Sequence, residues 1–285
     1  MSAEQVTIIT VCRNSAHLLS RTMRSVLEQT AFDSGRAKLQ YVIRDGVSSD
    51  ETNEIVASFD QTTIDFVSEP DTGMYDALAR GLREASGQVV AYINAGDILF
   101  PSAIDVALDV MEQTGSRWLS GYSVRLNESG QVTSVERPMK YSKPLIDAGL
   151  YGRRGLPFIQ QESTIWHRDL NQTIDLATLA SYRLAGDHYL WHCFAQQQSL
   201  DVVDSLIGAF AVHEGQLSSD RDAYWAEVER HASPVGVAAS LRAAGEAATW
   251  RLPSPITRRL GGSSHIRFDD SSQRWRRGAR FARGR

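Results

Sequence analysis

The sequence is poor in cysteine and has no long apolar run. Its 285 residues include only two cysteines, Cys12 and Cys193, which excludes a cysteine-based zinc site and a disulfide framework. No window approaches eighteen uncharged apolar residues, and the first residues, MSAEQVTIITVC, lack the basic and apolar regions of a signal peptide. We therefore expect a protein of the reducing cytosol with no membrane span.

Several phosphate-binding and catalytic signatures are also missing. No GxGxxG follows the first predicted strand, and no GxxxxGK[ST] occurs anywhere in the chain. These absences argue against dinucleotide-dependent dehydrogenases and P-loop kinases. The histidines are not accompanied by a nucleophile elbow, which argues against a serine hydrolase.

The charges that are present are sorted along the chain. The formal net charge is −4, but residues 251–285 hold ten arginines, no lysine and two acids, which sum to +8 and leave −12 for residues 1–250. A basic end favours contact with an anionic membrane surface, and its alternative is a solvated, disordered end. The acidic body argues against a nucleic-acid binder.

Short apolar strands alternate with amphipathic helices over the first hundred residues. Strands are predicted at residues 6–11, 39–43, 64–67 and 88–93. This alternation predicts a mostly parallel sheet with helices on both faces, whose ligands bind at the carboxyl ends of the strands.

The second half of the chain is mixed. Apolar spacing after Pro101 predicts a helix, and a sequence of turn residues at 127–130 predicts a hairpin. The hairpin strands are 118–126 and 131–136, further strands are 158–166 and 206–212, and further helices are 187–194 and 220–231. A Pro-Ser-Pro sequence at 253–255 marks a boundary.

Polar residues follow four of the predicted strands, at 10–14, 45, 68–73 and 94–97, and should converge on one sheet edge. Together with later segments they resemble a family 2 glycosyltransferase of the GT-A fold. The matching stretches, in family order over residues 6–220, are TIITVCRN, YVIRDGVSSDETNEIV, SEPDTGMYDALARGL, ASGQVVAYINAGDILFP, FIQQESTIWHRDL, LAGDHYLW and FAVHEGQLS.

The resemblance implies a Rossmann-like α/β fold, with a mostly parallel sheet between helices, a mixed acceptor-side half and a C-terminal helical, basic tail. On this basis residues 1–220 form the glycosyltransferase domain, with 1–100 as the nucleotide-binding half and 101–220 as the acceptor half. Residues 221–250 are then a helical segment, and 251–285 are a basic tail with the membrane as its expected partner.

The activity implied is transfer of a sugar from a nucleotide-diphosphate donor, UDP- or dTDP-linked, to an acceptor hydroxyl, with inversion at the anomeric carbon. The implied partners are a glycan or lipid-linked acceptor in surface polysaccharide or glycolipid synthesis. The implied cofactor is Mn²⁺ or Mg²⁺, since the leaving diphosphate gains negative charge in the transition state.

The resemblance assigns Asp97 to the last acidic position of the family's Asp-x-Asp metal motif and His213 to a C-terminal metal or diphosphate contact. The motif is incomplete, because Ala95 stands where a second aspartate is expected and Asn94 is the nearest extra polar group, a candidate substrate contact. Asp97 could instead cap the helix that follows Pro101.

The resemblance assigns Asp45 to the nucleobase, Thr10 and Arg13 to the same nucleotide pocket, and Asp71 to ribose or sugar hydroxyls. The alternative for Asp45 is a turn residue, since Asp-Gly is a common turn pair. Relatives often carry Asn where this chain has Arg80, which bears on the identity of the sugar.

The resemblance assigns Asp187 to the catalytic base that takes the acceptor proton, and Glu162 is a second candidate that could bind acceptor or sugar instead. The alternative for Asp187 is a helix N-cap. Two other functions fit the same fold: a non-catalytic nucleotide-sugar binding or scaffold protein, and a nucleotidyltransferase.

Overall fold

The computed structural model describes residues 3–138, 140–212, 220–250 and 265–278. The strands are β1 (Glu4–Cys12), β2 (Ala37–Asp45), β3 (Ile64–Ser68), β4 (Val89–Asn94), β5 (Ile98–Leu99), β6 (Trp118–Ser120), β7 (Ser123–Leu126), β8 (Val132–Glu136), β9 (Thr164–His167), β10 (Asp201–Val203), β11 (Gly208–Ala211), β12 (His265–Asp269) and β13 (Arg274–Arg277). The α-helices are α1 (Ala16–Leu27), α2 (Thr30–Asp33), α3 (Thr52–Ala57), α4 (Met74–Glu84), α5 (Ala103–Thr114), α6 (Lys143–Asp147), α7 (Leu176–Ala180), α8 (Gly186–Gln197), α9 (Arg221–Val228) and α10 (Val237–Trp250), and the 3-10 helices are η1 (Gln161–Ser163) and η2 (Arg168–Thr173).

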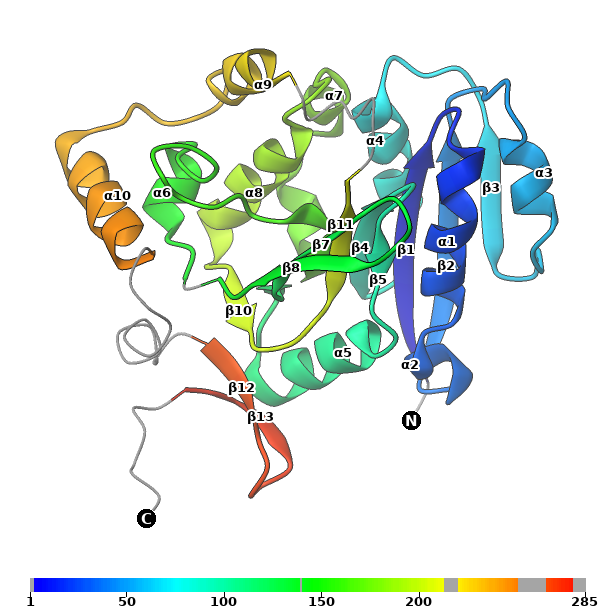
Figure 1. Ribbon diagram of the computed structural model, residues 1–285, viewed down its shortest axis with the longest axis horizontal. Helices are drawn as coiled ribbons and strands as arrows, with labels where there is room; N and C mark the ends of the chain where they lie inside the picture. Colours follow the sequence, from blue (N-terminus) through cyan, green and yellow to red (C-terminus); the bar gives the residue numbers. More distant parts are fainter. Residues whose placement is uncertain (1–2, 139, 213–219, 251–264, 279–285) are drawn as a thin grey trace.

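The main sheet has the strand order β13-β12-β10-β6-β9-β4-β1-β2-β3 (Figure 1). Its strands pair in parallel except for β9, which runs antiparallel to β4 and β6, and β13, which runs antiparallel to β12. The predicted α/β fold with a mostly parallel sheet is therefore confirmed.

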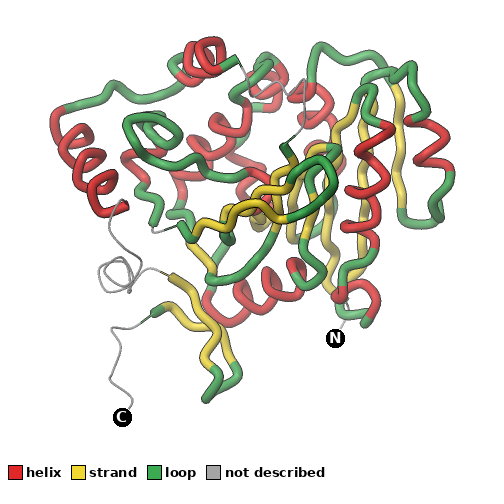
Figure 2. Tube along the Cα trace, viewed as in Figure 1, coloured by secondary structure: helices red, strands yellow, loops and turns green. Residues whose placement is uncertain are grey.

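Both faces of this sheet are covered, because side chains alternate along each buried strand. On β1, Val6 and Ile8 join one core with α1 and α5, whereas Ile9 and Val11 join a second core with α4 and α8. Helices accordingly flank the strands on two sides (Figure 2). This arrangement leaves the strand ends free to carry the polar residues.

The predicted hairpin forms, but only the second part of its first predicted strand takes part in it. Residues 118–126 divide into β6, which joins the main sheet, and β7, which pairs with β8 in a smaller sheet of order β5-β11-β7-β8. The division falls near Gly121, where a Cβ atom would lie 2.5 Å from Ile207 Cγ1 and 2.7 Å from the Ser205 carbonyl oxygen. Close packing at this glycine lets the chain change sheets.

The predicted strand at 158–166 is shorter than expected, because residues 161–163 form η1 and only β9 is extended. In η1 the Gln161 amide donates to the Tyr92 carbonyl and accepts from the Asn94 amide at 3.1 Å. These side-chain bonds replace a strand ladder and hold Glu162 beside the end of β4.

The end of the chain differs from the expected tail. Residues 265–278 contain β12 and β13, and β12 pairs in parallel with β10 to extend the main sheet. Ile266 and Trp275 are buried in the same core as α5. The sequence predicted no strand here. β13 has one buried residue, Trp275, between arginines, so it lacks the apolar alternation by which a strand is recognised in a sequence. Residues 251–264 and 279–285 lie outside the described part.

Among the residues that the structure describes, none of the helices is both long and apolar enough to cross a membrane.

Candidate active site

The candidate site residues come from different elements that end at one edge of the main sheet. β1, β2, β3 and β4 are parallel, so residues that follow these strands share an edge. Because β9 runs antiparallel to β4, the residues that precede β9 lie at this same edge. Asp45, Asp97 and Glu162 therefore lie along this edge although they are far apart in sequence.

The nucleotide side of the site is built around Gly46. A Cβ atom at this glycine would lie 2.6 Å from Asp71 Oδ2 and 3.2 Å from Arg13 Cδ, so both side chains approach the backbone after β2. Burial raises the pKa of Asp71, and the positive charge of the exposed Arg13 acts in the opposite direction. The structure therefore brings Arg13 and Asp71 together beside Asp45.

Asp45 is buried, and the fold already uses its carboxylate. Oδ2 accepts the backbone N–H of Ser48 at 2.9 Å and the Ser68 hydroxyl at 2.6 Å, while Oδ1 accepts the Ser48 hydroxyl. These bonds tie the turn after β2 to the end of β3. The turn role is thus present in the structure, and contact with a nucleobase stays a prediction.

Thr10 is placed differently from the other predicted contacts. It lies inside β1 with none of its surface exposed, and its hydroxyl is 3.0 Å from the Tyr41 hydroxyl. The hydroxyl thus links β1 to β2 in this structure, and contact of Thr10 with a nucleotide stays a prediction.

Asp97 follows β4 and is almost completely buried. Its Oδ1 accepts the backbone N–H of Ala211 at 2.8 Å, and burial raises its pKa to about 7, with partial relief from the charge of Arg21. It does not cap the next helix, since α5 begins after Ser102. Asp97 is therefore a buried carboxyl group at the strand edge with no cap role.

Glu162 in η1 is 3% exposed, and its Oε1 has no hydrogen-bond partner among the described residues. Burial, together with the nearby charges of Asp97 and Asp187, raises its pKa well above the usual value. Two carboxyl groups that share a dry site cannot both ionise easily. Burial and the neighbouring carboxyl groups therefore both favour the protonated form of Glu162.

Asp187 lies in the first turn of α8 and is half-buried. The N-cap of α8 is Ala185, so the alternative that Asp187 is the N-cap is wrong. Burial raises its pKa to about 6, while hydrogen bonds from His188 N–H, Tyr224 and Tyr75 work in the opposite direction. Asp187 is thus mostly ionised at pH 7, which suits a general base.

Comparison with known proteins gives the family. The profile of Glycosyl transferase family 2 matches residues 7–160, more than half of the chain. The chain belongs to this family. The match covers the strand-end residues from Arg13 to Asp97, whereas Glu162, Asp187 and α9 lie beyond it.

Two curated glycosyltransferases show how far sequence similarity to family members extends. One from Mycobacterium tuberculosis is 29% identical over 40% of this chain and 42% of its own length. The Escherichia coli UDP-Glc:alpha-D-GlcNAc-diphosphoundecaprenol beta-1,3-glucosyltransferase WfgD is 27% identical over 51% of this chain and 56% of its own length. The matches thus span about half of these relatives.

Two solved structures share the fold of this family member. Residues 1-349 of S. aureus TarS in complex with UDP-GlcNAc are 16% identical, with a TM-score of 0.58 over 90% of this chain and 70% of that TarS chain. The mannosyltransferase PcManGT from Pyrobaculum calidifontis, in complex with GDP-Man and Mn²⁺, is 17% identical, with a TM-score of 0.57 over 90% of this chain and 79% of its own. At such identities the likeness concerns the fold.

A divalent cation fits this glycosyltransferase site at Asp97. The Arg21 guanidinium donates to the Gly96 and Glu128 carbonyls, and the Asn94 Oδ1 atom has no partner among the described residues. No group of three His, Cys, Asp or Glu side chains in the described part could hold a metal alone. Mg²⁺ is often held by one or two carboxylates with substrate phosphates. His213 lies outside the described residues.

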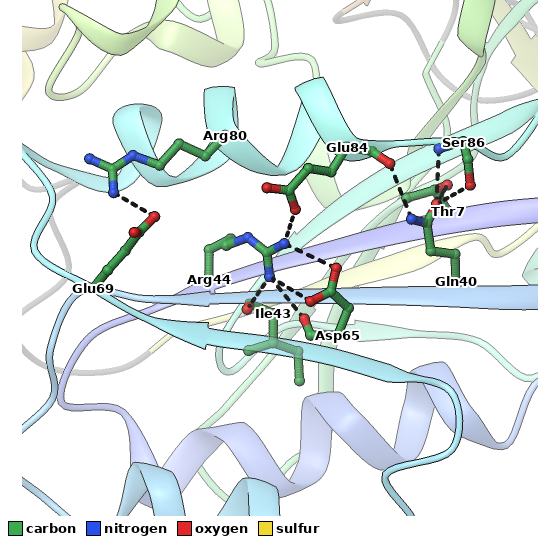
Figure 3. A network of polar contacts seen from close by, with 9 residues as sticks. All are labelled: Thr7, Gln40, Ile43, Arg44, Asp65, Glu69, Arg80, Glu84 and Ser86. Carbon is green, nitrogen blue, oxygen red and sulfur yellow. Dashed lines mark hydrogen bonds and ion pairs between the residues drawn. The ribbon is translucent and has the colours of Figure 1, made fainter.

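Sequence reasoning missed two residues beside Asp187, Tyr224 and Glu227, and did not single out Tyr75 within its motif. Tyr75 is the second residue of α4 and belongs to the quoted motif SEPDTGMYDALARGL, and the other two lie on the predicted helix 220–231. A polar face on that helix was the available signal. Arg80 of α4, in contrast, pairs with Glu69 at 2.7 Å, in the loop that precedes the helix (Figure 3).

Proposed function

We propose that this protein transfers a sugar from a nucleotide-diphosphate donor, UDP- or dTDP-linked, to an acceptor hydroxyl with inversion at the anomeric carbon. The observation that carries the proposal is the meeting of Asp97, Glu162 and Asp187 in one buried cluster at the carboxyl edge of the sheet. Membership of Glycosyl transferase family 2 supports it. The acceptor class is a glycan or a lipid-linked sugar in surface polysaccharide or glycolipid synthesis, as the name of WfgD indicates for that relative.

Asp187 is the base in this mechanism. As the acceptor oxygen attacks the anomeric carbon, its proton passes to the Asp187 carboxylate, and the bond from that carbon to the diphosphate oxygen breaks. Attack from the face opposite the leaving nucleoside diphosphate inverts the configuration. A pKa near 6 leaves Asp187 mostly ionised at pH 7 and still basic enough to accept the proton.

Glu162 has a different role, because burial raises its pKa and favours its protonated form. A protonated carboxyl group can donate a hydrogen bond to a hydroxyl of the donor sugar or the acceptor. Its unpartnered Oε1 is available for such a contact. Of the two catalytic candidates, we therefore propose Asp187 for proton transfer and Glu162 for orienting a sugar.

Asp97, with Asn94 beside it, would hold Mn²⁺ or Mg²⁺, and His213 is a further candidate ligand. When bound, such a cation stabilises the charge that develops on the leaving diphosphate. On the nucleotide side, Arg13 can pair with phosphate, Asp71 can accept from ribose or sugar hydroxyls, and Asp45 can accept from the imide N–H of uracil or thymine.

The test is release of nucleoside diphosphate from UDP- and dTDP-sugars with Mn²⁺ or Mg²⁺ and a lipid-linked sugar acceptor. Asp187→Asn should lower kcat by about 10²- to 10⁴-fold with donor affinity unchanged, since it removes only the base. Asp97→Ala should weaken metal-dependent donor binding in calorimetry. Asp175→Asn is the matched control, because Asp175 caps α7 from an exposed position.

The outcomes separate the rival functions. Donor binding without turnover in the wild type would support a binding or scaffold protein. Release of pyrophosphate from a nucleoside triphosphate would support a nucleotidyltransferase. Asp97→Ala with unchanged donor binding would overturn the proposed metal site.

Contact of residues 251–285 with an anionic membrane stays a prediction. Arg267, Arg276 and Arg277 form ion pairs with aspartates of the chain, so these described arginines serve the fold. Such a contact would depend on the other arginines of the segment, and it is not needed for the transfer that we propose.

A further inference from the structure

One helix beyond the part matched by the family profile contacts the turn that carries Asp187. This helix is α9, which contributes Tyr224 and Glu227. Residues three apart lie on the same face of a helix, so both side chains point toward α8. Neither residue belongs to a motif that predicted the site.

Glu227 binds the backbone that leads into α8. Its carboxylate accepts the N–H groups of Leu184 and Ala185, both at 2.8 Å, and that of Arg183 at 3.0 Å. Hydrogen bonds to an ionised acceptor are stronger than neutral ones. Three of them on consecutive residues fix where the first turn of α8 begins.

Tyr224 reaches the Asp187 carboxylate itself. Its hydroxyl lies 3.3 Å from Oδ1 and 3.5 Å from Oδ2, and the Tyr75 hydroxyl of α4 lies 3.5 Å from Oδ1. Tyr75 also donates to the Leu184 carbonyl at 3.2 Å. A Cβ atom at Gly186 would lie 2.4 Å from the Tyr75 ring, so α8 begins in close contact with α4.

The other groups that face Asp187 are few. Glu162 approaches from η1, and its charge interacts with that of Asp187, while the His188 N–H donates to Oδ1 at 2.7 Å. Tyr92 lies behind Tyr75. Among the described residues, no basic side chain is bonded to Asp187. The side-chain hydrogen bonds that favour its ionised form come from the hydroxyls of Tyr75 and Tyr224.

We propose that α9 is a positioning element for the base, in which Glu227 fixes the turn before α8 and Tyr224, opposite Tyr75, holds the Asp187 carboxylate. This inference rests on the proposed function of Asp187. Tyr224 and Glu227 act through Asp187 and are positioning residues.

Tyr224→Phe tests the carboxylate contact. Loss of a donor raises the pKa of Asp187, so the acid limb of kcat should move to higher pH, and kcat at pH 6 should fall about 10-fold with donor affinity unchanged. Tyr151→Phe is the matched control, because its buried hydroxyl also binds a carboxylate, Glu246 at 2.8 Å, away from α8. It should leave the acid limb in place.

Glu227→Gln tests the turn. We expect kcat to fall with KM for the donor little changed, and hydrogen exchange at the amides of residues 183–185 to become at least about 10-fold faster. Glu229→Gln is the control, since Glu229 is exposed and pairs with Arg153 at 3.3 Å.

Two failures can be told apart. An active wild type whose Tyr224→Phe variant keeps the wild-type pH profile would overturn the contact and leave the transferase intact. An inactive wild type would overturn the proposed function and the catalytic meaning of α9 together. Unchanged exchange in Glu227→Gln would overturn the role of Glu227 in either case.

Discussion

Some polar side chains of the site have hydrogen-bond partners within the protein, and others have none among the described residues. The Asp45 carboxylate accepts three hydrogen bonds from Ser48 and Ser68, whereas Glu162 Oε1 and Asn94 Oδ1 have no partner among the described residues. A buried polar atom without a partner costs free energy unless a ligand or water satisfies it. The open atoms thus mark where a substrate or cation would bind.

Asp45→Asn should separate the structural role of this residue from a nucleotide contact. An amide has one acceptor oxygen, so the variant loses bonds from the Ser48 and Ser68 groups, and the free energy of unfolding should fall by about 1–3 kcal/mol in urea titrations. Uridine diphosphate should also bind more weakly if the base contact exists. Asp60→Asn, at an exposed turn, serves as control. Unchanged stability would contradict the structural role.

At the scale of elements, the loop between β3 and α4 is held at its start by one side chain of the helix. Arg80 of α4 pairs with Glu69 at 2.7 Å and with Asp76 at 2.9 Å, and it donates to the Pro70 carbonyl at 3.1 Å. Figure 3 shows the first of these contacts. Asp71 directly follows the anchored residues Glu69 and Pro70, so its position depends on the loop.

Arg80→Ala should therefore affect the donor more than the fold. Exposed ion pairs contribute little to stability, so the melting temperature should change by only a few degrees. Without the Arg80 contacts, the loop holds Asp71 less firmly in position. KM for the donor should therefore rise about 5- to 10-fold, with a smaller change in kcat. Arg83→Ala, on an exposed face of the same helix, is the control. Equal KM values in both variants would contradict this role.

At the scale of the whole molecule, the hairpin of β12 and β13 is joined to the rest of the main sheet by a network of ion pairs. Asp204, after β10, pairs with Arg137 at 2.6 Å, His265 at 2.9 Å and Arg267 at 2.8 Å. Nearby, Asp201 binds Arg277. Residues 265–277 are thus joined to β10 and to the residue that follows β8.

Asp204→Asn should loosen this joint in a pH-dependent way. Burial alone would raise the pKa of Asp204, but hydrogen bonds from His265 and Arg137 lower it to about 2. A lowered pKa stabilises the fold above the unfolded value near pH 4, and this contribution is lost as pH falls toward 2. At pH 7 the variant should be less stable by about 2 kcal/mol.

Urea unfolding at several pH values measures this difference, which should shrink toward pH 2. Asp270→Asn is the control, since Asp270 is exposed in the turn between β12 and β13. A difference that does not vary with pH would contradict the ionic origin.

The sequence predicted the strands and helices of the first hundred residues well, because each has a clear apolar period. It also predicted that Asp45, Asp71 and Asp97 follow strand ends, and the parallel sheet places them at one edge. It failed at 158–166 and at 265–278, where side-chain bonds and ion pairs replace an apolar pattern.

By itself, the amino-acid sequence determined the α/β class, the family resemblance and the set of carboxyl groups from which the site is built, since periodicity and motifs are local properties. Tertiary structure alone decided how burial shifts the pKa of each carboxyl group and which residues contact Asp187. Tyr224 meets Asp187 across 37 residues, and Asp97 meets Ala211 across 114. Burial and hydrogen bonding at such separations arise only when the elements pack, and they set the charge on each group of the site.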